Sequence, residues 1–322
     1  MPFIYISLSL VFLLFAIFMI AGYVIFLRVC KRRPERPETF DGMFSENKLS
    51  LSTEVRLRED YNWFDENRTK EISITSMDGL KLYATVINVK KDTIAKGVVI
   101  VFHGYRSSAR RDTCMQMRIL HEAGYHLIVA DQRAHGRSEG KYICYGSKER
   151  FDAMAWRKKA ADIFGKEMPV ALMGLSMGGA TVLMASALAD KSDKALRCVI
   201  ADCPFSSPWD IVSYVIWKRH RIYPKPILYF VNFWCKTLAK FDLTTPTSAK
   251  CVANTHLPIL IFHGDRDGYV PHRHSVNIAD ASPKRATLSL FKDADHGEAI
   301  FYDEERYTKE LLTFLENNMG LS

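Results

Sequence analysis

The fold is decided by the stretch Val170-Ala171-Leu172-Met173-Gly174-Leu175-Ser176-Met177-Gly178-Gly179. Residues 170–173 are typical of a strand buried on both faces, and residues 177–189 predict a helix. Between them, Ser176 is the centre of a Gly-x-Ser-x-Gly pattern, whose glycines allow a sharp turn that raises the serine Oγ above a sheet. The helix N-terminus then directs its N–H groups at developing negative charge. Ser176 is therefore the candidate nucleophile, and an ordinary glycine-rich turn is the competing interpretation.

Short apolar runs on both sides of this stretch predict further strands of the same sheet. These runs are residues 98–102, 126–130, 198–201, 259–262 and 287–291, and the intervening helical stretches lie near 110–123, 148–165 and 299–318. Strands that alternate with helices form a doubly wound sheet with helices on both faces. Residues 71–75 and 80–89 alternate in polarity around Asp78-Gly79, which predicts an antiparallel hairpin at the start. The predicted fold class is α/β, with a mostly parallel sheet of the eight-stranded type.

The predicted catalytic core comprises residues 70–204 and 255–322. Residues 205–254 interrupt it and are too long for a plain crossover, so they are predicted to form a small helical cap over the carboxyl edge of the sheet. The cap contains Trp209, Tyr214 and Trp217, which we expect to bind the apolar acyl or aryl group of a substrate. A lid also buries an apolar face against the sheet, so plain packing is an equally good explanation of these aromatic residues.

A serine hydroxyl is a weak nucleophile and requires a base that a third group holds in place. His296 follows the last predicted strand and precedes a glycine, which makes it the candidate base. The candidate acid is Asp267, shortly after residues 259–262. Asp265 and Asp202 also follow predicted strands and are the alternatives to Asp267.

The oxyanion of an acyl-transfer reaction requires two preorganised N–H donors. We expect one donor to be the backbone of Met177, at the start of the helix after the nucleophile. The second is expected from the loop after residues 98–102, where Tyr105 is the candidate. His103 in the same loop is then a residue that shapes the loop, not a second base.

Residues 1–30 are predicted to be a transmembrane anchor. Residues 3–27 carry no charge, and a helix of about 25 residues spans roughly 37 Å, which is enough to cross a bilayer. A signal peptide is the alternative, although it normally has a basic start and a shorter apolar run. Basic residues follow the span and none precede it, which predicts a single-pass protein of the cell membrane with a cytosolic catalytic domain. They are Arg28, Lys31, Arg32, Arg33 and Arg36, and residues 31–69 are predicted to be a basic and polar linker.

Composition excludes several other classes of function. The formal net charge is +8, but much of the excess lies beside the apolar run and no nucleic-acid motif occurs, so we expect no nucleic-acid partner. The seven cysteines have no regular spacing and no Cys-x-x-Cys pair, which argues against a disulfide scaffold and a zinc cluster. His272 and His274 do not converge well on one metal position. We expect neither a metal nor an organic cofactor.

Taken together, these motifs resemble the α/β-hydrolase superfamily over residues 70–318. The motifs are His103-Gly104, residues 131–138, residues 174–178, residues 263–267 and His296-Gly297. The chain looks most similar to bacterial serine hydrolases with one N-terminal anchor and a short cap. This resemblance implies that Ser176, Asp267 and His296 are nucleophile, acid and base. It also implies that Tyr105 donates the second oxyanion hydrogen bond and that residues 131–138 form a structural loop.

The predicted activity is that of a serine esterase. The reaction is hydrolysis of a carboxylic ester through an acyl-serine intermediate, and the partner is a small-molecule or lipid-like ester. A peptidase, thioesterase or acyltransferase with the same triad is the alternative, followed by a binding module without catalysis. The sequence favours no particular oligomeric state.

Overall fold

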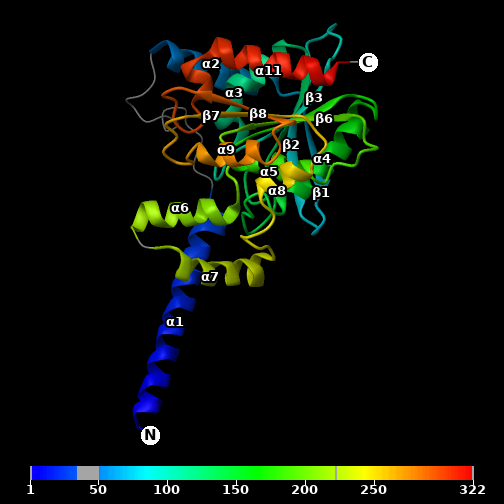
Figure 1. Ribbon diagram of the computed structural model, residues 1–322. Helices are drawn as coiled ribbons and strands as arrows, with labels where there is room; N and C mark the ends of the chain where they lie inside the picture. Colours follow the sequence, from blue (N-terminus) through cyan, green and yellow to red (C-terminus); the bar gives the residue numbers. More distant parts are fainter. Residues whose placement is uncertain (1, 35–50, 222, 321–322) are drawn as a thin grey trace.

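Eight strands form one sheet at the centre of the predicted core domain (Figure 1). The computed structural model describes residues 2–34, 51–221 and 223–320. The strands are β1 (Lys70–Thr75), β2 (Lys81–Ile87), β3 (Gly97–Phe102), β4 (Tyr125–Ala130), β5 (Val170–Leu175), β6 (Leu196–Asp202), β7 (Ile259–Gly264) and β8 (Ala286–Phe291). Their order is β1-β2-β4-β3-β5-β6-β7-β8, with β2 antiparallel to both β1 and β4 and all other pairs parallel. The predicted fold class and the opening hairpin are confirmed.

Helices cover both faces of the sheet, because successive strand residues point to opposite faces. In β3, Val99 and Val101 belong to one apolar core, whereas Val98, Ile100 and Phe102 belong to the other. The first core is closed by α2 (Leu51–Asn67), α3 (Ala109–Glu122), α10 (Ala299–Tyr302) and α11 (Glu304–Met319). The second is closed by α4 (Glu149–Phe164), α5 (Met177–Ser186), α8 (Ser248–Asn254) and α9 (Arg273–Asp280). This sandwich holds the carboxyl ends of the parallel strands at one edge, where the candidate site lies.

The predicted linker at residues 31–69 is partly wrong as an assignment, because residues 51–67 form helix α2 and pack against α3. The buried residues Leu57, Tyr61 and Phe64 lie on one side of α2, at the spacing of a single helical face. Asp60 is also buried on this helix, where it accepts a hydrogen bond from Arg118 of α3 at 2.6 Å. The remainder of the predicted linker at residues 35–50 lies outside the described residues.

The predicted cap at residues 205–254 contains helices outside the core of the domain and one helix, α8, that belongs to the core. Its elements are α6 (Pro208–His220), α7 (Lys225–Trp234), the π-helical turn η2 (Cys235–Ala239) and α8. Helix α6 lies over the carboxyl edge, where the Tyr214 hydroxyl donates to the Gly268 carbonyl oxygen at 3.3 Å. Helix α8 instead buries Val252 in the core beside the sheet, so the predicted cap boundary at residue 254 is too late.

Helix α1 (Pro2–Cys30) extends away from the domain, but its last turns are part of it (Figure 1). Its segment Leu8–Cys30 is long and apolar enough to cross a membrane, a criterion that signal sequences near an N-terminus also meet. Phe26 and Cys30 are fully buried in a cluster with residues of α5, α6 and α7. The side chain of Arg32 then donates to the carbonyl oxygens of Gly136 and Ser138 at 2.5 and 2.6 Å. The predicted boundary between anchor and domain at residue 30 therefore lies inside a packed interface.

Helix α5 approaches β3 so closely that it requires glycine at its second residue. A Cβ atom on Gly178 would lie 2.1 Å from the Phe102 carbonyl oxygen. We predict that Gly178→Ala lowers the free energy of unfolding by about 1–3 kcal/mol, because overpacking displaces the two backbones. Thermal unfolding followed by circular dichroism measures this change.

The matched control is Gly268→Ala, because the nearest atoms to a Cβ at Gly268 lie at an ordinary 3.6 Å. Its melting temperature should stay close to that of the wild-type chain. Equal destabilisation by both substitutions would contradict the argument from close approach.

Candidate active site

Ser176 lies in a strained turn between β5 and α5. Its backbone has φ 55° and ψ −111°, a conformation that is unfavourable for a residue with a side chain. The turn is held because the Ser176 N–H donates to the Asp202 carbonyl oxygen at 2.7 Å. Gly174 is required as well, since a Cβ there would lie 2.2 Å from the Gly178 carbonyl carbon. The sequence pattern thus forms the sharp strand-to-helix turn that it predicts.

Ser176, His296 and Asp267 meet through two hydrogen bonds at the carboxyl edge of the sheet. The Ser176 Oγ lies 3.0 Å from His296 Nε2, and His296 Nδ1 lies 2.6 Å from Asp267 Oδ2. The serine follows β5, the acid follows β7 and the histidine follows β8, so the parallel sheet brings together three residues that are distant in sequence. The distances suit proton transfer from the hydroxyl to an imidazole that the carboxylate orients.

The Asp267 carboxylate is buried and fully engaged. Its Oδ1 accepts backbone hydrogen bonds from Tyr269 and Val270 at 2.8 and 2.7 Å. Its Oδ2 is shared by His296 and by His263 Nε2, which lies at 3.0 Å. Burial opposes ionisation, but the hydrogen bonds from these two histidines outweigh it and hold the pKa of Asp267 well below its usual range.

His263 is a residue that the sequence analysis quoted but did not place in the site. Its Nε2 faces two acceptors, Asp267 Oδ2 at 3.0 Å and the Val270 carbonyl oxygen at 2.8 Å, so Nε2 carries the proton. Its Nδ1 then accepts from the Ser275 hydroxyl at 2.6 Å. The signal for this role was its place at the end of β7, four residues before the acid.

The two alternative acids are engaged elsewhere. Asp202 Oδ2 accepts a hydrogen bond from the Tyr307 hydroxyl at 2.8 Å, and burial raises the pKa of Asp202 to about 6. Asp265 Oδ1 accepts the Asp293 N–H at 2.7 Å. Only Asp267 among the three hydrogen-bonds His296 in the described residues.

The environment of His296 favours its charged form. Burial lowers the pKa of the ring, but the hydrogen bond and the charge of Asp267, with a contribution from Asp202, raise the pKa above the ordinary 6.5. An imidazole stabilised as imidazolium is a better acceptor for the serine proton. The same shift means that the neutral, proton-accepting form is lost as pH falls through this raised pKa.

The two candidate oxyanion donors belong to segments close to Ser176. Met177 is the first residue of α5, so its N–H has no acceptor within the helix. The loop that bears Tyr105 is close, because a Cβ on Gly104 would lie 3.6 Å from the Ser176 Cβ. The Gly104 N–H is already engaged with Asp112 Oδ2 at 2.6 Å, and the Tyr105 hydroxyl donates to the Val29 carbonyl oxygen at 2.7 Å.

His103 shapes this loop as expected. Its Nδ1 donates to the Gly104 carbonyl oxygen at 2.7 Å, and its Nε2 accepts from the Gln132 N–H at 3.1 Å. Both ring nitrogens are therefore engaged in holding two loops together.

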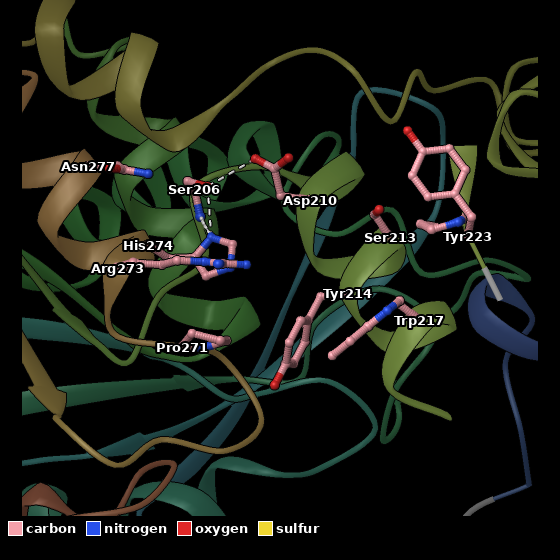
Figure 2. Close-up of a pocket in the computed structure, with 11 residues that line it drawn as sticks. Ser206, Asp210, Ser213, Tyr214, Trp217, Tyr223, Pro271, Arg273, His274 and Asn277 are labelled. Carbon is pink, nitrogen blue, oxygen red and sulfur yellow. Dashed lines mark hydrogen bonds between the residues drawn. The ribbon is translucent and has the colours of Figure 1, made fainter. Parts of the chain in front are cut away.

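The three aromatic cap residues occupy different surroundings. Tyr214 and Trp217 line a cavity of about 640 Å³ between α6 and α9, which Figure 2 shows. Trp209 does not line it, because its ring packs against Tyr229 with the ring centroids 5.2 Å apart. Neither Ser176 nor His296 is among the lining residues. The substrate-binding role of these aromatic residues therefore stays a prediction.

The same cavity contains a polar group that the sequence analysis did not single out. His274 is buried there with its Nδ1 2.8 Å from the Ser206 Oγ, and the Ser206 hydroxyl lies 3.1 Å from Asp210 Oδ2. Figure 2 shows these three side chains together on one side of the cavity. Burial lowers the pKa of His274 to about 4. No spacing in the sequence indicated this group, since its members come from three separate elements.

Among the described residues, one group of side chains is compact enough to hold a metal ion, and it overlaps the triad. It consists of Cys203, Asp267 and His296. Burial raises the pKa of the Cys203 thiol well above its ordinary value, so the thiolate that binds metals is disfavoured. The carboxylate and the imidazole are already hydrogen-bonded to each other. This donor set is better suited to proton transfer than to a metal.

We predict that the His296 ring titrates above pH 6.5 in the wild-type chain and at lower pH in Asp267→Asn. The substitution removes the negative charge that stabilises the imidazolium. Titration of the histidine ring protons by NMR measures the pKa. Asp265→Asn is the matched control and should leave the His296 pKa unchanged, whereas an equal decrease in both variants would contradict the assignment of Asp267.

Comparisons with known proteins agree with this fold. Residues 93–245 match the family model described as "Serine aminopeptidase, S33". The uncharacterized protein YqkD of Bacillus subtilis is 23% identical over 219 residues, which cover 68% of this chain and 71% of YqkD.

Two solved esterases are similar in structure. The Pyrococcus furiosus esterase PF2001 superposes with a TM-score of 0.62 and 23% identity, over 80% of this chain and 94% of that one. Est1E of Butyrivibrio proteoclasticus, solved with ferulic acid, has a TM-score of 0.59 and 20% identity, over 77% of this chain and 99% of that one. The eight-stranded sheet and these likenesses show the α/β-hydrolase fold, and the matched segment, which covers just under half of the chain, supports a serine hydrolase enzyme.

Proposed function

We propose that this chain hydrolyses carboxylic esters through an acyl-serine intermediate. The observation that carries the proposal is the continuous hydrogen-bonded row from Ser176 Oγ through His296 to Asp267, at 3.0 and 2.6 Å. The raised pKa of His296 and the lowered pKa of Asp267 support the same roles. A binding module without catalysis would have no need for this arrangement.

The reaction consists of two acyl transfers. His296 Nε2 takes the hydroxyl proton while Ser176 Oγ attacks the ester carbonyl carbon, and the resulting oxyanion accepts hydrogen bonds from the Tyr105 and Met177 amides. The imidazolium then gives its proton to the departing alcohol, which leaves the acyl group on Oγ. A water molecule, deprotonated by His296, attacks the acyl-serine and releases the carboxylic acid. Asp267 stays ionised throughout and stabilises the imidazolium.

Ester hydrolysis is favoured over the alternatives by the extent of the structural likeness. The two esterases are aligned over nearly their whole chains, so almost all of each has a counterpart in this chain. A peptidase is the second candidate, because the matched family is described as a serine aminopeptidase. Aminoacyl p-nitroanilides compared with p-nitrophenyl esters separate these two activities. Product analysis with added alcohols reveals an acyltransferase.

The proposed location is a membrane, with α1 as an uncleaved single-pass anchor and the catalytic domain on the cytosolic side. Retention of α1 is supported by packing, since removal of Phe26 and Cys30 would open the cluster that they fill. The basic residues after the span support the cytosolic side. A small-molecule or lipid-like ester is the proposed substrate.

We predict that Ser176→Ala lowers kcat for p-nitrophenyl esters by roughly 10⁴- to 10⁶-fold and that Asp267→Asn lowers it by about 10⁴-fold. The first variant lacks the nucleophile and the second fails to orient the base. For the wild-type chain, kcat/KM should fall with decreasing pH at a midpoint above 6.5, because His296 becomes protonated. Steady-state kinetics and labelling with a fluorophosphonate measure these effects.

Asp265→Asn serves as the control and should retain activity. Wild-type turnover by Ser176→Ala would eliminate the proposed nucleophile. A larger loss in Asp202→Asn than in Asp267→Asn would show that the acid is misassigned.

We predict that the full chain stays with membranes after an alkaline carbonate wash and that the double variant Val11→Arg, Leu14→Arg does not. Both side chains are exposed on α1, and each arginine at the centre of a span costs about 2.5–3.5 kcal/mol. Fractionation and immunoblotting measure the distribution. Met77→Arg, at an exposed position of the catalytic domain, is the control and should remain in the membrane fraction.

A further inference from the structure

We infer that helix α7 is embedded in the membrane parallel to its surface, in the leaflet next to the catalytic domain. The inference rests on the proposed anchor, because it depends on where α7 crosses α1. Figure 1 shows α7 crossing α1 partway along its length, on the far side of α6 from the sheet. A membrane that surrounds α1 must therefore also surround α7.

The contacts between the two helices fix the depth of α7. The Phe230 ring packs against Phe15 and Phe18, with centroid distances of 5.6 and 5.4 Å. A Cβ on Gly22 would lie 2.6 Å from the Phe230 Cβ. All three α1 residues lie within the uncharged run of residues 3–27, not beyond its end. Helix α7 is consequently at the level of apolar anchor residues.

The rise of a helix converts these contacts into a distance from the membrane surface. Gly22, the contact nearest the basic end, lies six positions before Arg28, the first basic residue after the span, which corresponds to about 9 Å along the axis. Amphipathic helices that lie in a membrane plane are buried to roughly 5–10 Å. Towards the N-terminus, residues 3–15 continue for about 18 Å. This length allows α1 to cross the rest of a hydrocarbon core of about 30 Å.

The outer side of α7 exposes apolar and aromatic side chains, and the adjoining turn adds one more apolar side chain beside exposed Lys236 and Thr237. We define the α7 face as Tyr229, Phe233 and Leu238, whose exposed fractions are 64%, 47% and 38%. Tyr229 and Phe233 are four residues apart and lie on one side of the helix. The opposite side, which includes Leu228 and Val231, is buried against the domain. Exposed aromatic residues on one side of a helix are typical of a lipid-facing surface.

Two polar side chains near this depth, Trp234 and Asn232, have protein partners, which a lipid environment requires. The Trp234 Nε1–H donates to the Met19 carbonyl oxygen of α1 at 3.0 Å. Asn232 points inward, where it donates to Asp242 Oδ1 at 3.0 Å and accepts the Leu243 N–H at 2.8 Å. These groups would not be left unsatisfied in hydrocarbon.

Charged side chains lie near the two ends of α7, and the second of them precedes Leu238 of the α7 face. Lys225 begins α7, and Lys236 lies in the turn that follows and pairs with Asp242. Long basic side chains at helix ends extend towards the headgroups while their methylene stems remain in the apolar layer. This position of α7 places the cavity between α6 and α9 at the membrane surface. Trp217 and Tyr223 lie on the same side of that cavity (Figure 2), and Tyr223 precedes α7 by two residues.

The test uses the full chain in phosphatidylcholine vesicles with a fluorescent probe on one introduced cysteine. The seven native cysteines are buried, so the unsubstituted chain serves as the labelling blank. Phe233→Cys reports on α7, Val11→Cys on the anchor and Ile94→Cys on the water-exposed surface of the domain. Tyr229→Cys repeats the α7 measurement one turn earlier. Quenching by nitroxide-labelled acyl chains is compared with quenching by aqueous iodide.

We expect probes at 233, 229 and 11 to lose most of their emission to nitroxide lipids and to be shielded from iodide, with the reverse for the probe at 94. The inference about α7 is overturned if iodide quenches the probes at 233 and 229 as strongly as the probe at 94. If lipid quenching at 11 persists in that case, the proposed anchor is unaffected. Iodide quenching at 11 overturns the anchor itself. Shielding of 233 and 229 from both quenchers indicates that a second copy covers the α7 face, which also overturns the inference.

Discussion

The site depends on the hydrogen bonds that the negatively charged Asp267 carboxylate accepts. A buried carboxylate is costly unless hydrogen bonds replace its hydration, and two imidazoles and two backbone N–H groups do so here. Those partners come from the end of β7, the loop after it and the loop after β8. The charge therefore fixes the loops at the same time as it fixes the His296 ring. Orientation of the base and order of the surrounding backbone have one physical cause.

The sequence predicted the parts of the molecule whose signals are local. Strands buried on both faces are continuous apolar runs, and Ser176 stands in a pattern that only a sharp turn satisfies. Helix α2 was missed because its many charges hide the spacing of Leu57, Tyr61 and Phe64. In the sequence, Asp60 is typical of a surface position, and only the structure shows that it is buried in an ion pair with Arg118. The second histidine on Asp267 was missed because its role depends on distances that spacing does not give.

Long-range packing was beyond what the sequence alone could predict. An apolar N-terminal helix is visible in composition, yet its contact with a segment more than two hundred residues away is not. The aromatic residues of the cap show the same limit, since residues that are alike in sequence have three different surroundings in the structure. Trp209 packs against Tyr229, Trp217 lines a cavity and Phe230 packs on α1. Only their three-dimensional positions separate these roles.

One carbonyl oxygen near the end of α1 links this helix to the loops around the candidate site. The hydroxyls of Tyr105 and Tyr145 both donate to the Val29 oxygen, at 2.7 and 2.9 Å, and their rings stack on each other. A shortened chain that begins after Cys30 loses this acceptor, so the buried hydroxyl of Tyr145 and the half-buried hydroxyl of Tyr105 are left without it. The first residue of any shorter catalytic fragment is thus set by this hydrogen bonding and not by the end of the apolar run.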